Sequence, residues 1–371
     1  MVDFAKFGND LYTGKRSIPV VPKRKIWYIL SISLALISLI GLGVRGLSPS
    51  IEFRGGSEFM VLGVEDPQES IATDTVMSEG GTEPPRVSIV GDDSVRIQTE
   101  RLSNEETLQI RHALADAYSV DIEAVTSSFV GPTWGADVTG KAIKALVIFL
   151  ALVAVIMTLY FRTWTMAVAG LLALLQDLVL TVGVYALIGF EVSPATVIGF
   201  LTILGYSLYD TVVVFDKVRE NAQGFLQQST QTYGELANLA VNQTVVRSIN
   251  TAVVALLPIG SILFIGSFVL GAGTLRDISL ALFVGTILGT FSSVFIATPI
   301  EVDLHNRKPA TKAHTQRIEE LRASGADAEQ VVVVESQEGS DDHASLVVPG
   351  SHRGNAAQPR RKRNKPKNRR K

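Results

Sequence analysis

The segment VIGFLTILGYSLYDTVVVFDKVREN, residues 197–221, decides the class of this protein, because it places a carboxylate inside a long apolar run. Its apolar part can cross the roughly 30 Å hydrocarbon core of a membrane as a helix. An ionisable side chain there costs roughly 2.5–3.5 kcal/mol on insertion scales, unless it faces a bundle interior, a partner or water. Asp210 is therefore a candidate functional residue. The alternative is a structural carboxylate satisfied by Ser, Thr or Tyr side chains of adjacent helices.

The composition of the whole chain is that of an integral membrane protein. Of its 371 residues, 47% are hydrophobic and 19% charged, and the mean hydropathy is +0.28. Soluble domains rarely combine so little charge with a positive mean hydropathy. The sequence has no cysteine, which excludes disulfides, thiol catalysis and cysteine-ligated metals. It also contains no P-loop, HExxH or serine-nucleophile motif, so we expect no enzyme, no metal and no cofactor.

Six apolar runs are long enough to span a bilayer, at residues 26–44, 145–161, 163–190, 192–215, 248–275 and 278–300. The predicted domains are a cytosolic N-terminus (1–25), transmembrane helix 1 (26–44), an extracytoplasmic domain (45–140), helices 2–4 (141–215), a cytosolic loop with an interfacial helix (216–247), helices 5–6 (248–300) and a cytosolic tail (301–371). Residues 309–358 are polar and poor in aromatics, which predicts disorder.

Lys and Arg near the span ends predict the orientation, because cytosolic loops carry an excess of them. With the N-terminus inside, the larger basic set is cytosolic, at positions 23–25, 162, 217, 219, 247, 307 and 308. The opposite side carries the smaller set, at positions 45, 54, 141, 144 and 276. We therefore expect a multi-pass plasma membrane protein with both termini in the cytosol.

The segment between the first two spans has the pattern of a folded α+β domain. The predicted elements are strands at 51–53 and 58–64, a helix at 67–80, a hairpin around Gly91, a helix at 103–118 and a strand at 121–130. The second helix begins with a capping box, Ser103 and Glu106. The order βαββαβ, with one extra leading strand, predicts a ferredoxin-like domain.

Two further polar residues accompany Asp210. Asp177, in the third span after Gln176, is either a second proton-accepting station or a helix-packing hydrogen bond. Arg247, at the cytosolic mouth of the fifth span, either forms a movable ion pair with Asp210 or is an ordinary snorkelling arginine.

Two other signals are less specific. Gly285 and Gly289 have the spacing of a close helix-packing motif. The basic run at 360–371 fits an anionic partner, either lipid headgroups or ribosomal RNA, and a solvated tail without a partner is the alternative.

The segment GYSLYDTVVVFDKVREN (205–221) closely resembles the fourth-span signature of SecF, the partner of SecD in the accessory complex of the bacterial Sec translocon. Weaker matches in the right order are IEFRGG (51–56), VGPTWG (130–135), QDLVLTVGVYAL (176–187) and NQTVVRS (242–248). The motif residues are Gly205, Tyr206, Ser207, Gln243 and Thr244 in the spans, and Gly55, Gly56, Gly131 and Pro132 outside them.

The resemblance implies a six-helix bundle related to half of an RND transporter, with SecD supplying the other half. It implies that the pair uses the proton-motive force in late export of preproteins through the SecYEG translocon, with Asp210, Arg247 and Asp177 as relay residues. The chain departs from the family at Gln176, where His is common, and at Tyr209, where Asn is usual. The alternatives are an RND-type small-molecule or lipid exporter and a purely structural subunit.

Overall fold

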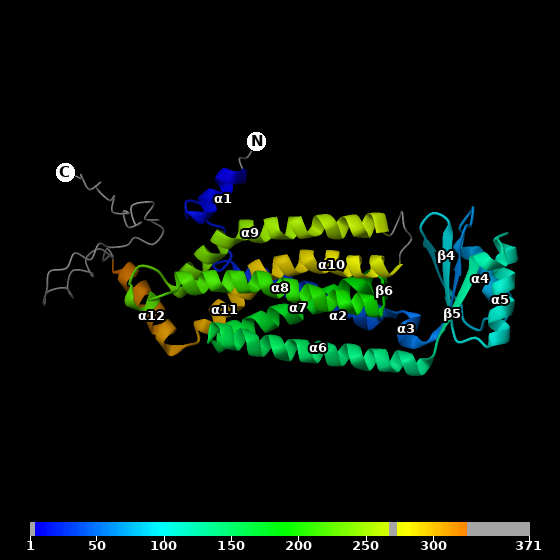
Figure 1. Cartoon of the computed structure of the whole chain (residues 1–371). Helices are drawn as coiled ribbons and strands as arrows, with labels where there is room; N and C mark the ends of the chain where they lie inside the picture. The colour runs from blue at the N-terminus through cyan, green and yellow to red at the C-terminus, as the bar shows by residue number, and fades with distance from the viewer. Residues whose placement is uncertain (1–3, 267–272, 325–371) are drawn as a thin grey trace, which may run out of the picture.

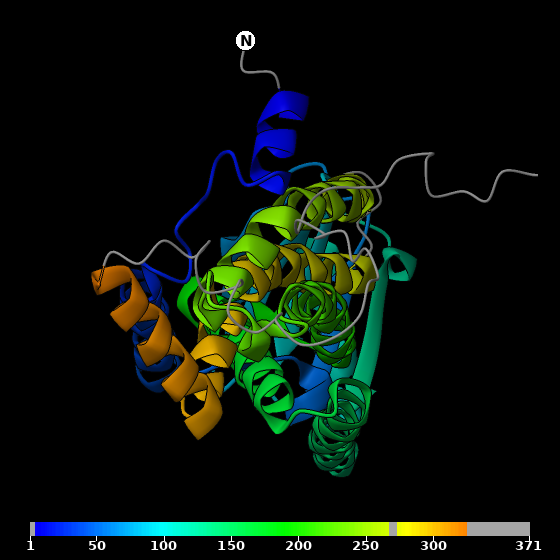
Figure 2. The same ribbon diagram turned by 90° about the vertical axis from the view of Figure 1, so that its left-hand side faces the viewer.

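The computed structural model describes residues 4–266 and 273–324, and shows a long helical bundle with an α+β domain at one end (Figure 1). Viewed along the bundle, α1 (Phe4–Tyr12) and α12 (Pro309–Ala323) lie at its periphery (Figure 2). The basic run at 360–371 and most of the segment predicted to be disordered lie outside the described residues.

Six helices of the described residues are long and apolar enough to cross a membrane, which confirms the predicted polytopic helical protein. They are α2 (Arg24–Arg45), α6 (Pro132–Phe161), α7 (Trp164–Ile188), α8 (Pro194–Asn221), α9 (Tyr233–Ser261) and α10 (Gly273–Ser292), the last of which continues through a π-helical turn (Ser293–Ala297) into α11 (Thr298–His305).

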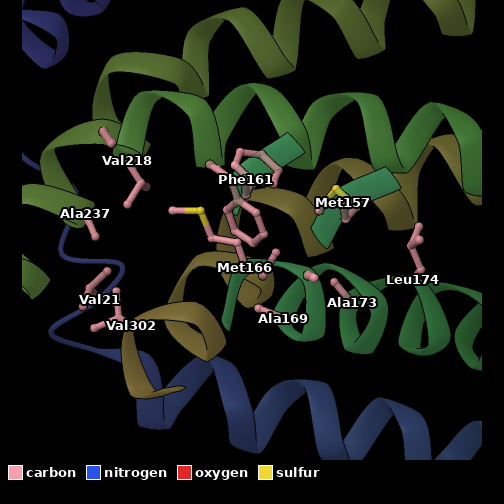
Figure 3. Packing of buried hydrophobic residues seen from close by; sticks show 14 of the residues in the cluster. Val21, Met157, Phe161, Met166, Ala169, Ala173, Leu174, Val218, Ala237 and Val302 are labelled. Atoms are coloured by element: carbon pink, nitrogen blue, oxygen red, sulfur yellow. The ribbon is translucent and has the colours of Figure 1, made fainter. Parts of the chain in front are cut away.

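The helices differ in how much of their apolar surface the chain itself covers. In the most apolar 18-residue stretch of α6, 11% is buried inside the protein, against 44% in α7 and α8 and 50% in the last span. One face of α6 packs on α7, where Met157 and Phe161 meet Met166 and Ala169 (Figure 3). The remaining surface of α6 is therefore available to lipid or to another subunit.

Two helices begin at other places than those predicted. The second span begins at Pro132 and not near 145, because proline is favoured in the first turn of a helix. The expected interfacial helix is the first half of α9, which starts at a Thr232–Glu235 capping box and runs unbroken into the span. Much of this half is buried against other helices. Because it is continuous with the span, it is not a separate surface helix.

The tail also differs from the expectation of disorder, since residues 309–323 form α12. Arg322 fastens this helix to the start of α9 and the loop before it. Its guanidinium donates to the Glu235 carboxylate at 2.8 and 2.9 Å and to the Thr230 carbonyl at 2.8 Å. A polar composition therefore did not prevent local order here, because the helix has a partner surface.

The domain between α2 and α6 contains the predicted βαββαβ order. Its elements are β2 (Gly56–Val61), α4 (Glu69–Ser78), β3 (Arg86–Val90), β4 (Ser94–Thr99), α5 (Asn104–Ala117) and β5 (Val125–Val130). The strands form an antiparallel sheet in the order β3-β4-β2-β5. The helices cover one face of the sheet and share its core, which includes Phe59, Ile97, Ile110 and Leu114. The sheet domain is confirmed, and its assignment to the ferredoxin-like class stays a prediction.

The extra leading strand was wrong, because residues 51–54 form a short helix, α3 (Ile51–Arg54). Gly55 and Gly56 end it with φ values of +80° and +144°, which side chains rarely allow. The preceding strand β1 (Ser48–Pro49) pairs in parallel with β6 (Glu191–Val192), far along the chain. This small sheet joins the domain entry to the turn between α7 and α8.

The most extensive helix contact of the described residues is between α8 and α10, where glycine lets the backbones approach. A Cβ on Gly285 would lie 2.5 Å from a side-chain carbon of Ile203, whereas one on Gly205 would meet nothing within 4 Å. Gly289 has a similarly close neighbour in Ser207, at 2.9 Å.

We predict that Gly285→Ala destabilises the protein by about 1–3 kcal/mol, because the new methyl group overpacks this contact. Gly205→Ala is the matched control on the facing helix, and should be neutral or stabilising by up to about 1 kcal/mol through helix propensity. Thermal unfolding of the purified chain in detergent measures both. Equal melting temperatures for the two variants would contradict the packing role of Gly285.

Candidate functional site

Asp210 lies in the middle of α8, is 6% exposed and is hydrogen-bonded to two other helical segments. Ser248 Oγ of α9 donates to Oδ1 at 2.6 Å, and Ser293 Oγ, in the π-helical turn, donates to Oδ2. Both carboxylate oxygens therefore have donors, which is what a charge in an apolar bundle requires. The carboxylate joins three parts of the bundle at one point.

The Ser293 hydroxyl has a second acceptor within reach, the carbonyl oxygen of Thr290 at 3.1 Å. An ionised carboxylate only accepts, whereas a protonated one donates through its own O–H. Protonation of Asp210 therefore allows Ser293 to turn its proton to Thr290 and to accept from Asp210. The π-helical turn that carries Ser293 is a feature found frequently at functional sites.

Asp177 of α7 lies beside this centre and contacts the same helix α8. It is 3% exposed, and Ser207 Oγ donates to its Oδ2. Its Oδ1 has no hydrogen-bond partner among the described residues, and Ser292 Oγ faces the carboxyl without hydrogen-bonding geometry. A Cβ on Gly289 would lie 3.7 Å from Asp177 Oδ2, so this glycine leaves room for the Asp177–Ser207 pair.

The expected ion pair between Arg247 and Asp210 is absent from the described residues. Arg247 Nη2 donates instead to the hydroxyl of Tyr209 at 3.1 Å, at the exposed surface of the bundle. Tyr209 is 53% exposed while its neighbour Asp210 is buried, and Arg247 likewise precedes the buried Ser248. Adjacent residues of a helix point in different directions. Because Ser248 points into the bundle toward Asp210, the preceding Arg247 points to the surface, away from the carboxylate.

The other predicted motif residues hold the frame around the site. Gln243 accepts from Asn221 Nδ2 at 3.0 Å and donates to the Tyr12 carbonyl, which joins α9 to α8 and α1. Thr244 is buried but bonds only to its own helix, and Tyr206 is half-buried near Asp210 on α8.

Two motif glycines lie where the chain enters and leaves the domain. A Cβ on Gly56 would lie 2.4 Å from the Thr99 carbonyl oxygen, so only glycine fits there. Gly131 caps α6 and Pro132 occupies its first turn. None of these residues contacts Asp210, so their roles are structural.

A contact that sequence reasoning missed joins the domain to the bundle at Glu191. Gln98 Nε2 of β4 donates to Glu191 Oε1 at 2.8 Å, and the Ser50 backbone N–H donates to the Val192 carbonyl at 2.9 Å. Two residues after Glu191, Ser193 caps α8, and its hydroxyl donates to Asp277 Oδ2 at 2.7 Å. The helix that carries Asp210 therefore begins at the point where the domain docks.

The family model for the protein export membrane protein SecD/SecF, C-terminal, matches residues 109–307. The protein translocase subunit SecF of Streptomyces coelicolor is 44% identical over 94% of this chain and 94% of its own length. The chain belongs to the SecF family. The SecF subunit of Mycobacterium tuberculosis is 41% identical over 87% of this chain and 75% of its own length.

The fold of this SecF-family chain is also similar to a solved structure. The crystal structure of SecDF from Thermus thermophilus, described as a translocon-associated membrane protein, matches with a TM-score of 0.69 at 29% identity. The match covers 79% of this chain and 39% of that longer one. The membrane region of SecDF and the six-helix bundle are therefore alike.

Of the residues that hold Asp210, sequence reasoning missed Ser248 and Ser293. Both were visible as hydroxyls in or beside apolar runs, but helical periodicity does not say which neighbouring helix a given face meets. Asp210 and Asp177 were identified because charge in an apolar run is conspicuous in the sequence.

We predict that Ser248→Ala destabilises the protein by about 1–3 kcal/mol, because it leaves a buried carboxylate oxygen without its donor. Ser279→Ala is the control, since Ser279 is equally buried but donates only to carbonyls of its own helix. Thermal unfolding of the two variants in the same detergent compares them. A Ser279→Ala loss as large as that of Ser248→Ala would contradict the special role of the Asp210 contact.

Proposed function

We propose that this SecF-family chain couples the proton-motive force to the late-stage export of polypeptides across the plasma membrane. The observation that carries the proposal is Asp210, a buried carboxylate whose oxygens take hydrogen bonds from two other helical segments. A group placed in this way changes its contacts when it gains a proton. Moving one charge across the membrane supplies about 2.3 kcal/mol per 100 mV, enough to bias such a change.

In this mechanism a proton from the outer side reaches Asp210, with Asp177 as a neighbouring station. The two carboxylates contact α8 within one turn of each other, since Ser207 binds Asp177 and Asp210 follows on the same helix. Protonation reverses the Ser293 hydrogen bond and loosens the junction of α8, α9 and the π-helical turn. Deprotonation toward the cytosol restores it.

The movement of α8 would reach the extracytoplasmic domain through the docking contact at Glu191. The sheet residue Gln98 and the paired strands β1 and β6 hold the domain against the turn that begins α8. A tilt of α8 would therefore shift this contact, and the sheet, which we infer holds the emerging preprotein, would move relative to the bundle. Arg247 would join the relay only in a second conformation, in which a rotation brings it from Tyr209 toward Asp210.

We infer that SecD is the partner subunit. SecDF of Thermus thermophilus carries the matching region within a single longer chain, of which this chain covers 38% in sequence. The sparsely covered helix α6 offers an apolar surface for lipid or for such a partner. The SecYEG translocon and a contact of residues 360–371 with anionic lipid or the ribosome complete the proposal. The basic residues near the spans favour cytosolic termini.

Asp210→Asn tests the coupling, because it keeps the size and polarity of the side chain but cannot ionise. We expect the proton-driven stimulation of preprotein export in membrane vesicles to fall to the level seen without the subunit, with ATP-driven export unchanged. Asp216→Asn, an exposed carboxylate on the same helix, is the control and should retain full stimulation. Full stimulation by Asp210→Asn would refute the relay.

A cross-link tests whether the domain must move at the docking contact. The chain has no cysteine, so Pro49→Cys with Val192→Cys, partners in the β1–β6 pair, creates a single engineered pair. We expect oxidation to suppress proton-driven export and reduction to restore it. The control pair, Met60→Cys with Thr126→Cys, joins strands β2 and β5 within the sheet and should leave export unchanged. Equal activity of the oxidised and reduced docking pair would contradict a moving domain.

A further inference from the structure

A second buried carboxylate, Glu301 of α11, lies near the end of the bundle opposite the extracytoplasmic domain. It is 0% exposed. The hydroxyl of Tyr233 donates to Glu301 Oε1 at 2.8 Å, and His305 Nδ1 lies 3.2 Å from the same oxygen. Oε2 is buried and has no partner among the described residues. The carboxylate is thus only half satisfied within the protein.

Glu301 follows Ser293, the donor to Asp210, by about two turns along one continuous helical segment. Over that separation a regular α-helix advances by roughly 80° beyond two full turns, at about 100° per residue. The wider π-helical turn between them reduces this angle, because it holds more residues per turn. Ser293 and Glu301 are therefore brought toward the same side of the helix, and both are fully buried.

Two further buried polar groups lie on α11 and on α7, which packs against it. Thr298 of α11 is 0% exposed, and its hydroxyl has no protein partner among the described residues. Thr165, at the start of α7, has the same two properties. Buried polar groups without protein partners are places where internal water binds. Water at these two hydroxyls would supply part of a hydrogen-bonded route on the Glu301 side of the bundle.

We propose that Glu301 is a second proton-carrying carboxylate, which receives the proton from Asp210 and passes it through His305 to the cytosol. The inference rests on the proposed function, because it assigns the exit of the same proton. The O–H bond of the Asp210 carboxyl breaks and one forms on Glu301, through water between them. The negative charge returns to Asp210, and the second transfer moves the proton from Glu301 to the imidazole.

The groups around Glu301 suit this role. His305 stacks on the Tyr233 ring at 3.9 Å between centroids, which holds the imidazole beside the carboxylate. On the other side, Phe225 separates His305 from His314 of α12, whose Nε2 bonds to the Gln228 carbonyl. The nearby Asp303 is engaged with Arg24 and Tyr28. No Lys or Arg pairs with Glu301 in the part of the chain that the structure describes, so no fixed cation holds it ionised.

A purely structural role would have Glu301 serve only as the acceptor of the Tyr233 hydroxyl. Glutamine supplies that acceptor without a buried charge, and its size is almost the same. The variant Glu301→Gln therefore distinguishes the two roles. It keeps an acceptor for the Tyr233 hydroxyl but cannot take up and release a proton.

The experiment measures proton uptake, with a pH-sensitive dye, in proteoliposomes that contain the full chain together with SecD. We expect Glu301→Gln to lower proton flux about tenfold or more, the scale of lost acid–base participation, with an unchanged melting temperature. Asp303→Asn, which neutralises a nearby carboxylate that is engaged with Arg24 and Tyr28 and not with Glu301, should retain most of the flux. Glu301→Asp should retain more flux than Glu301→Gln, and should keep a dependence of flux on internal pH that the glutamine variant loses.

Asp210→Asn in the same assay separates the two proposals. If Asp210→Asn abolishes flux and Glu301→Gln does not, the proton leaves by another route and this inference is wrong while the proposed function stands. If Asp210→Asn retains flux, the proposed function itself fails. If Glu301→Asp loses stability and flux as fully as Glu301→Gln does, Glu301 is a structural residue and the inference is overturned.

Discussion

The constraint on which the membrane region depends is the placement of a carboxylate among apolar helices. A charge there is costly unless hydrogen-bond donors compensate for its burial. Asp210 obtains them from Ser248 and Ser293, so three segments must meet within hydrogen-bonding distance of one side chain. Gly285 and Gly289 permit the approach of α10 to α8 that brings Ser293 there. The hydrogen bonds to Asp210 therefore depend on the close glycine contact between α8 and α10.

The same constraint links the bundle to the domain outside it. The helix α8 carries Asp210 between the Glu191 contact at its start and the loop before α9 at its end. Ser193 ties α8 to Asp277 at the start of the last span, so α8 and α10 are joined both there and at Asp210. This geometry favours movement of the pair as a unit.

The sequence predicted the six spans, the hairpin of the domain, the capping box at Ser103 and the two intramembrane carboxylates, because hydropathy, turn chemistry and isolated charge are local signals. It did not predict Ser248, Ser293 or Glu301 as partners, because helix-to-helix contacts depend on rotation and register. Arg247 shows the limit well, since its chemistry suits an ion pair but its position on α9 turns it toward Tyr209. Continuity of α9 and order in α12 likewise follow from tertiary packing.

The length of α6 sets where the domain stands. Its 30 residues extend about 45 Å, roughly 15 Å more than the hydrocarbon core needs. The first turns of α6 pack tightly against the start of the domain, since a Cβ on Gly135 would lie 2.3 Å from the Phe53 carbonyl oxygen. The domain is therefore held at one end of a single rigid helix. Each residue added to these first turns of α6 would lengthen the helix by about 1.5 Å. It would also rotate the attached domain by about 100° about the helix axis.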